Sequence, residues 1–118
     1  APVPAMILSL DVKRLRRVFI NLILNATDAM PSDGTITLRF SQDAREVVTE
    51  VADTGSGIAP EMMEKLFQPF ATNGKGHGTG LGLSICKKIV EDHGGRIWAR
   101  NDPAGGAVFA FSLPLPAN

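Results

Sequence analysis

The sequence lacks the features that mark several large classes of protein. Its 118 residues include one cysteine, Cys86, so no internal disulfide can form, which is typical of a reducing compartment. Twelve basic residues balance 12 acidic ones, which argues against a non-specific nucleic-acid binder, because such proteins carry a basic excess. No apolar run approaches the roughly 18–20 residues of a membrane-spanning helix. We expect a single domain that buries its own core.

Glycine is unevenly distributed along the chain. Seven of the 12 glycines lie between Gly55 and Gly82, and the other five fall in predicted turns. Glycine lets the backbone bend sharply or approach another group closely. We therefore expect this stretch to hold the parts of the chain that contact a ligand.

The spacing of apolar residues predicts three helices. Asp11 is a suitable N-cap, apolar residues then recur three and four positions apart, and Pro31 ends the pattern. A later helix begins with a proline near its first position, and the last one ends at Gly94-Gly95. The predicted helices span Val12–Met30, Pro60–Phe67 and Leu81–Asp92.

Alternating apolar and polar residues predict the strands. We expect the short segment 1–10 to be the remnant of a linker that includes a first strand, and residues 11–116 to form the domain. The predicted fold class is an α+β two-layer sandwich, with a mixed, mostly antiparallel sheet covered on one face by about three helices. The predicted strands span Met6–Leu10, Thr35–Phe40 (half-buried), Glu46–Ala52, Arg96–Arg100 and Ala107–Leu113 (alternating).

Three polar residues share one face of the first predicted helix. Asn21, Asn25 and Asp28 lie at i, i+4 and i+7. A face turned toward solvent is one interpretation, since exposed polar residues are the norm. A row of oxygen ligands for a hard cation such as magnesium is the other. The helix alone does not decide between them.

The first glycine loop directly follows a predicted strand. In Asp53-Thr-Gly55-Ser-Gly57, the carboxylate could accept a hydrogen bond from an exocyclic amine, and the glycines permit close approach to a flat ring. A capped tight turn is the simpler interpretation, because Asp and Gly both favour turns and short glycine patterns often match by chance.

The second glycine loop leads straight into the last predicted helix. Glycines alternate through the segment Gly76–Leu83, and exposed amides at a helix N-terminus form an anion site for which phosphate is the usual occupant. The segment is not a Walker P-loop, because no Gly-Lys-Ser/Thr triplet ends it. A flexible linker fits poorly, since leucines interleave the glycines. Together, the polar face and the two loops predict a nucleoside triphosphate bound with magnesium.

These motifs resemble those of the catalytic and ATP-binding domain of two-component sensor histidine kinases, in the GHKL superfamily that includes DNA gyrase. The resemblance extends from about Asp11 to Pro114, and the Asn-Ala-x-x-Ala-Met pattern is most like the nitrogen-regulation type. Asn21–Ala26 resembles the N box, Asp53–Gly57 the G1 box, Phe67–Phe70 the F box, Gly78–Leu83 the G2 box, and His93–Gly95 with Gly106–Pro114 the closing pattern of the family.

The resemblance implies a Bergerat fold and a role for each matching residue. Asn25 would coordinate Mg²⁺ and Asn21 would support it, as the catalytic pair. Asp53 would bind the adenine amine, and residues from about 68 to 79 would form a flexible ATP lid. Lys75 of that lid would reach the γ-phosphate, although a solvated lysine is an equal alternative. The residues expected to bind ATP are Asp53, Gly55, Gly57, Ile58, Phe70, Thr72, Lys75, Gly78, Thr79, Gly80, Leu81 and Gly82.

Two departures from the family pattern bear on the chemistry. Members that hydrolyse ATP carry a glutamate base one turn before the magnesium asparagine, and here that position is Asn21, whose amide cannot take a proton from water. This favours a kinase over an ATPase. Asp28 stands where some histidine kinases have a basic residue, so that phosphate contact is absent.

The chain has no histidine in the setting of a phosphoacceptor. We expect His77 to be a lid residue and His93 to cap a helix by complementing its dipole. We then expect Ala1 to begin a piece of a longer protein. The resemblance implies a separate dimerisation and phosphoacceptor domain as partner, a downstream response regulator, a dimeric parent protein, no nucleic-acid partner, and a cytoplasmic location with a possible membrane tether on the parent. The alternatives are a nucleotide-responsive binding module and a serine kinase of the anti-sigma type.

Overall fold

A computed structural model describes residues 11–30, 32–69 and 82–115 of the chain. The strand predicted over Met6–Leu10 lies outside these residues. The elements of the described part are α1 (Val12–Ala29), β1 (Thr37–Gln42), β2 (Glu46–Ala52), α2 (Pro60–Met63), α3 (Gly82–Asp92), β3 (Ile97–Asn101) and β4 (Ala107–Pro114).

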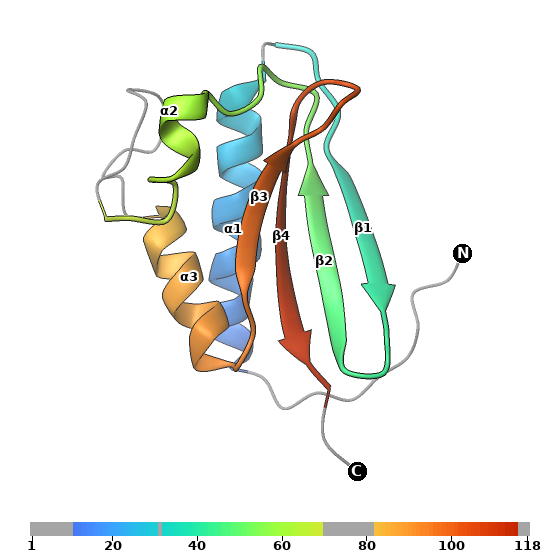
Figure 1. Ribbon diagram of the computed structural model, residues 1–118, viewed down its shortest axis with the longest axis vertical. Coiled ribbons are helices and arrows are strands. Elements are labelled where there is room, and N and C mark those ends of the chain that lie inside the picture. Colours follow the sequence, from blue (N-terminus) through green and yellow to red (C-terminus); the bar gives the residue numbers. More distant parts are fainter. Residues whose placement is uncertain (1–10, 31, 70–81, 116–118) are drawn as a thin grey trace.

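The described strands form one sheet in the order β1-β2-β4-β3, and every neighbouring pair is antiparallel. The helices lie together on one face of this sheet (Figure 1). This arrangement confirms the predicted α+β class. The core fills the space between the two layers, where Val51, Phe109 and Phe111 of the sheet meet the buried stripes of α1 and α3.

The first helix, α1, follows its sequence pattern closely. The Asp11 side chain accepts a hydrogen bond from the Arg14 amide at 3.2 Å, which is the predicted N-cap. Phe19 packs edge-on against Phe111 of β4, with ring centroids 5.4 Å apart. The helix ends at Ala29, one residue before the predicted end. Its buried stripe consists of Leu15, Val18, Leu22 and Ala26.

The third helix, α3, packs beside α1 and is fastened to it at the end near Asp11. The Asp11 amide donates to His93 Nε2 at 3.0 Å, and His93 Nδ1 lies 2.9 Å from the Ile89 carbonyl oxygen. The His93 ring thus lies at the end of α3 and joins it to the start of α1. Hydrogen bonds from Lys88 and Arg14 hold the pKa of Asp92 below its usual value.

Cys86 lies at the centre of the contact between α3 and α1. Its side chain is fully buried, and its Sγ lies 3.9 Å from the Val18 carbonyl oxygen. Burial raises the pKa of the Cys86 thiol to about 11, so the group stays neutral and behaves as a small core side chain.

The outer strand β1 departs from its prediction. It spans Thr37–Gln42 rather than Thr35–Phe40, and all six of its residues are exposed instead of alternating. Among the described strands β1 pairs only with β2, and the buried stripe of α1 packs closer to the middle of the sheet. Leu38 and Phe40 are each 43% exposed as a result. Alternation in the sequence predicted one buried and one exposed face for this strand. It did not reveal that the strand lies at the edge of the sheet, where both faces are exposed.

The inner strand β4 is more buried than its prediction. It reads as an alternating strand, but every residue from Ala107 to Leu113 is buried. Because β4 pairs on both sides, its second face is flanked by longer side chains of its neighbours. Ala110, for example, lies in register with Glu50 of β2 and Trp98 of β3.

The second helix, α2, is shorter than its prediction. It ends at Met63 rather than Phe67, and tighter turns with i to i−3 hydrogen bonds follow. These turns bury Leu66 and bring the Phe67 ring edge-on to Phe109, with centroids 6.4 Å apart. The apolar residues that suggested a longer helix are therefore used to close the core.

We expect replacement of Leu22 by Ala to lower the free energy of unfolding by about 2–5 kcal/mol, because this side chain is fully buried between the layers. Leu24→Ala on the same helix is the matched control, since Leu24 is 38% exposed, and its cost should be under ~1 kcal/mol. Urea unfolding followed by circular dichroism measures both. Equal losses for the two variants would contradict the described core.

Candidate functional site

The predicted site residues within the described part of the chain come from three places that the fold brings together. These are the second half of α1, the loop after β2 and the start of α3. The candidates within the described residues are Asn21, Asn25, Asp53, Gly55, Gly57, Ile58 and Gly82. The others lie outside the described residues, namely Phe70, Thr72, Lys75, Gly78, Thr79, Gly80 and Leu81.

The Asp53 carboxylate is buried at the end of β2, with only 4% of the residue exposed. Its Oδ1 accepts hydrogen bonds from the amides of Gly55 at 2.9 Å and Ala107 at 3.1 Å. Its Oδ2 is also buried, but it has no hydrogen-bonding partner among the described residues. A buried oxygen without a partner costs about 1–3 kcal/mol, and more when it is charged. The carboxylate is thus fixed by one oxygen and presents an unsatisfied acceptor with the other.

The start of β4 holds Asp53 through its backbone as well as its side chain. The Asp53 amide donates to the Ala107 carbonyl oxygen at 2.9 Å, next to the bond between Ala107 and Oδ1. Gly106 takes φ +85°, and a Cβ at this position would collide with the Asp53 carbonyl oxygen. The turn before β4 must therefore place a glycine against Asp53.

The loop after Asp53 rests on the C-terminal end of α1. A Cβ on Gly55 would collide with the Ala29 carbonyl oxygen, and the Ser56 amide donates to that same oxygen at 3.3 Å. The second glycine, Gly57, has φ +82°. Both predicted glycines are thus required by the local backbone, one by close approach and one by conformation.

The start of α3 rests on the middle of α1. The Asn21 side chain donates from Nδ2 to the Gly82 carbonyl oxygen at 3.3 Å, across 61 residues of sequence. Asn21 contacts the start of α3, and Ala29 contacts the loop after Asp53. These two residues lie about 12 Å apart along α1, given the helical rise of 1.5 Å per residue. Asn25 lies one turn from each contact, on the face that it shares with Asn21.

The Asn25 side-chain amide offers an oxygen ligand for a metal. The residue is half-buried within α1, and its side chain makes no hydrogen bond with any of the described residues. The described part of the chain contains no group of three or more His, Cys, Asp or Glu residues that could hold a metal by themselves. A magnesium ion at Asn25 would therefore need further oxygen ligands from water or from a bound anion.

One residue of this region was missed by the sequence prediction. Asn101, at the end of β3, accepts a hydrogen bond from the Ile58 amide at 2.7 Å and donates to the Ile58 carbonyl oxygen at 3.0 Å. The two residues are 43 positions apart, and the residues around Asn101 read simply as the end of a strand. No local pattern predicts such a pairing.

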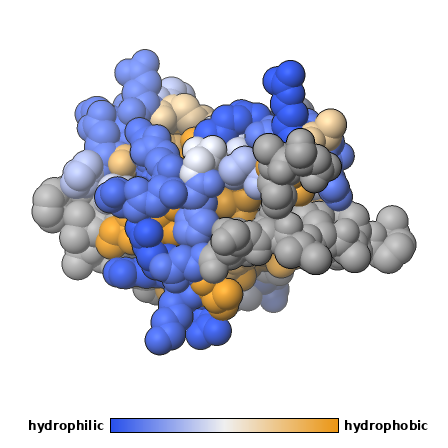
Figure 2. Space-filling view, turned by 90° about the horizontal axis from the view of Figure 1, so that it is seen from below, coloured by the Kyte–Doolittle hydropathy of each residue, from blue (hydrophilic) through white to orange (hydrophobic). Residues whose placement is uncertain are grey.

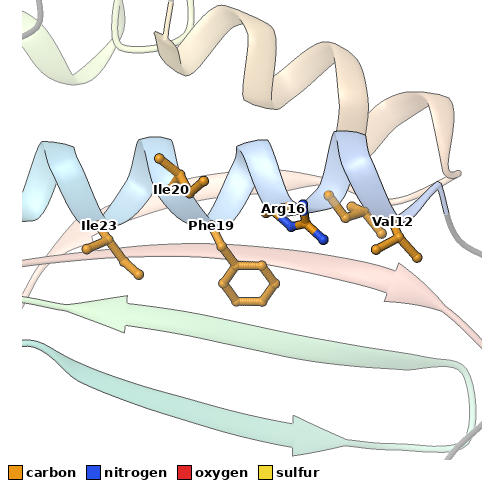
Figure 3. A pocket seen from close by; sticks show the side chains of 6 residues that line it. Val12, Arg16, Phe19, Ile20 and Ile23 are labelled. Atoms are coloured by element: carbon orange, nitrogen blue, oxygen red, sulfur yellow. The ribbon is translucent and has the colours of Figure 1, made fainter.

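An apolar groove lies elsewhere on α1, away from these residues. It has a volume of about 350 Å³, and Val12, Phe19 and Ile23 extend from α1 toward the strands on this side (Figure 3). Seen from below, the surface at the nearby end of the molecule is mostly hydrophilic, with separate apolar patches (Figure 2). Arg16 supplies the charge in the groove lining, so the groove offers no set of groups for chemistry. In the described residues, no helix is long and apolar enough to cross a membrane.

Comparison with known sequences extends over almost the whole chain. Residues 10–117 match the family described as histidine kinase-, DNA gyrase B-, and HSP90-like ATPase. The chain is 40% identical over 118 residues to the sensor protein KdpD of Clostridium acetobutylicum, a match that covers 96% of this chain and 13% of that protein. The chain therefore spans about an eighth of the length of this relative.

Comparison with solved structures gives the same family. The catalytic domain of histidine kinase ThkA is 43% identical, with a TM-score of 0.80 over 90% of this chain and 70% of that one. ThkA in complex with the response regulator TrrA is similar at a TM-score of 0.75 and 40% identity, over 90% of this chain and 30% of that one. Full-length ShkA in complex with AMPPNP is similar at a TM-score of 0.82 and 30% identity, over 100% of this chain and 24% of that one. None of these relatives specifically supports the predicted nitrogen-regulation type.

We expect Gly106→Ala to lower the free energy of unfolding by more than about 3 kcal/mol, because it adds a clash with Asp53 to the strain of a positive φ. Gly105→Ala is the control, since Gly105 has φ +110° with nothing near its Cβ, and its cost should be about 1–2 kcal/mol. Urea titration of both variants gives the comparison. If the two alanines cost the same, the close contact between Gly106 and Asp53 is absent.

Proposed function

The chain belongs to the family of histidine kinase-, DNA gyrase B- and HSP90-like ATPases, and from this membership we propose that it is the ATP-binding catalytic domain of a sensor histidine kinase. In this proposal it binds Mg-ATP and presents the γ-phosphate to a histidine on a separate phosphoacceptor domain. Residues 11–116 form the domain, and residues from about 68 to 79 form its ATP lid.

The buried Oδ2 of Asp53 is the observation that carries the proposal. It is an acceptor without a partner among the described residues, on a carboxylate whose other oxygen is fixed by two backbone amides. The exocyclic amine of adenine is a donor of the kind that this oxygen lacks. A guanine ring presents a carbonyl oxygen at the corresponding position and would leave Oδ2 unsatisfied. The carboxylate therefore favours adenine over guanine.

The contact between Asn21 and Gly82 supports a phosphate site beside the middle of α1. It brings the start of α3, which follows the glycine-rich segment, against the face of α1 that carries Asn25. Mg²⁺ would be held by Asn25 together with phosphate oxygens of ATP, and it would neutralise charge on the phosphates. The chain has zero net charge, so attraction of the anionic ligand has to be local.

The residues of this site favour transfer to a protein over hydrolysis. Phosphoryl transfer depends mainly on positioning and on neutralisation of charge. The accepting imidazole nitrogen forms a bond to the γ-phosphorus, the bond from that phosphorus to the bridging oxygen breaks, and ADP leaves. Asn21 stands where a base for water would be needed, and its amide instead donates to Gly82.

The named neighbours suggest the partners of the proposed reaction. ShkA was solved with AMPPNP and ThkA with a response regulator, and we extend a nucleotide and a response regulator to this chain by analogy. The phosphoacceptor domain and the dimeric state of the parent protein belong to the same proposal. We infer a cytoplasmic location from the need for ATP and from the single free cysteine.

We expect isothermal titration to show ATP binding by the wild-type chain in Mg²⁺, and Asp53→Asn to weaken it about 10- to 100-fold. The asparagine can keep Oδ1 as an acceptor for Gly55 and Ala107, but it places an NH₂ donor against the donor of adenine.

Asp43→Asn is the matched control for this experiment. The Asp43 carboxylate also accepts two backbone amides in a turn, and these bonds hold its pKa below the usual value, but it lies in the β1–β2 loop. This variant should bind ATP as the wild type does. Absence of ATP binding by the wild type, or equal binding of ATP and GTP, would refute the proposed function.

We expect Asn25→Ala to remove the dependence of ATP binding on magnesium, because the described part of the chain offers no acidic cluster that could hold the ion instead. The ratio of ATP affinities in Mg²⁺ and in EDTA should fall toward one. Thr27→Ala is the control, since Thr27 is exposed and its hydroxyl bonds to the Ile23 carbonyl oxygen of the same helix. An unchanged ratio in Asn25→Ala would exclude Asn25 as the ligand.

A further inference from the structure

The loop Asp53–Ile58 follows β2 and has few contacts that fix its far end. Near Asp53 it is anchored to β4, and at Ser56 it is anchored to the end of α1 by one bond of 3.3 Å. The bonds between Asn101 and Ile58 are the only described hydrogen bonds that attach Ile58 to another element. The Ile58 side chain packs against the core, but its backbone is fixed by one side chain from a distant part of the sequence.

The Asn101 amide matches the Ile58 backbone with both of its polar groups. Its Oδ1 accepts from the Ile58 amide at 2.7 Å, and its Nδ2 donates to the Ile58 carbonyl oxygen at 3.0 Å. An asparagine side chain reproduces in this way the paired bonds that a neighbouring strand would make. Two bonds in this geometry fix both the orientation of the Ile58 backbone and its distance from Asn101.

Gly57 is adapted to the same contact. A Cβ on Gly57 would lie 2.9 Å from Asn101 Oδ1, closer than ordinary packing allows. The absence of a side chain at Gly57 thus lets Asn101 reach the backbone of Ile58. The positive φ of Gly57 turns the chain immediately before this contact.

Asn101 also belongs to the hairpin that fixes Asp53. It is in register with Ala107, whose amide donates to Asp53 Oδ1 and whose carbonyl accepts from the Asp53 amide. The end of the β3–β4 hairpin therefore holds both ends of the loop. Ala107 of β4 bonds to Asp53, and Asn101 of β3 bonds to Ile58.

We propose that Asn101 is a positioning residue for the base of the bound nucleotide. It holds Gly57 and Ile58 at a fixed place relative to Asp53, so that the ring can contact the loop while its amine reaches Oδ2. This inference rests on the proposed nucleotide function. Asn101 contacts the Ile58 backbone rather than the ligand, so it acts through the loop.

The experiment measures ADP binding to the 118-residue chain by isothermal titration, well below the urea and temperature range of unfolding. Asn101→Ala should weaken ADP binding roughly five- to tenfold, because it removes two hydrogen bonds that hold the loop. Amide hydrogen exchange at Ile58 in the absence of ligand should become faster. A residue that only stabilises the fold would shift unfolding without changing the affinity of folded molecules.

Two further variants separate positioning from a general effect. Asn101→Asp keeps an acceptor for the Ile58 amide but loses the donor, so its ADP affinity and its Ile58 exchange should fall between those of the wild type and Asn101→Ala. Arg100→Ala is the matched control, because the adjacent Arg100 is exposed and pairs with Glu50 at 3.5 Å on the sheet. It should bind ADP as the wild type does.

The outcomes distinguish this proposal from the one it rests on. If the wild type and Asn101→Ala bind ADP equally well, the positioning role is wrong while the nucleotide function stands. If Arg100→Ala loses affinity as much as Asn101→Ala, the effect belongs to the strand and the role assigned to Asn101 is again wrong. If the wild type binds no ADP, the proposed function fails, and the positioning role fails with it.

Discussion

The arrangement of the site depends on one buried carboxylate that is only half satisfied. Asp53 ends β2 with Oδ1 bonded to two backbone amides, while its buried Oδ2 lacks a partner among the described residues. The local structure holds this residue in place, because Gly106 must be a glycine to lie against the Asp53 backbone. A fold that needed Asp53 only for stability would gain by satisfying both oxygens. An acceptor kept buried and unpaired is instead the form that a specific ligand donor requires.

The long helix α1 relates this carboxylate to the rest of the site. Its Ala29 carbonyl end supports the loop after Asp53, its Asn21 amide supports the start of α3, and Asn25 lies between them. The spacing along one helix face thus sets the distance between the end that would hold the base and the end that would hold the phosphates. The buried stripe on the same helix fixes its rotation against the sheet, so packing and site geometry are set by the same residues.

The sequence predicted much of this arrangement because its signals are local. The cap at Asp11, the period of α1 and the alternation in β2 are each contained in a few residues, and these elements are confirmed to within one residue. The exposure of β1 and the burial of both faces of β4 were not predictable, since they depend on strand order. The contact of Asn101 with Ile58 was missed for the same reason, because two distant segments make it.

The central claim is that Asp53 Oδ2 accepts a hydrogen bond from the amine of adenine. A crystal structure of this chain grown with ADP and Mg²⁺ tests it most directly. The account predicts the amine nitrogen about 2.7–3.2 Å from Oδ2, with Oδ1 still bonded to Gly55 and Ala107. An adenine ring bound elsewhere, or a ring in this place whose amine faces away from Asp53, would contradict it.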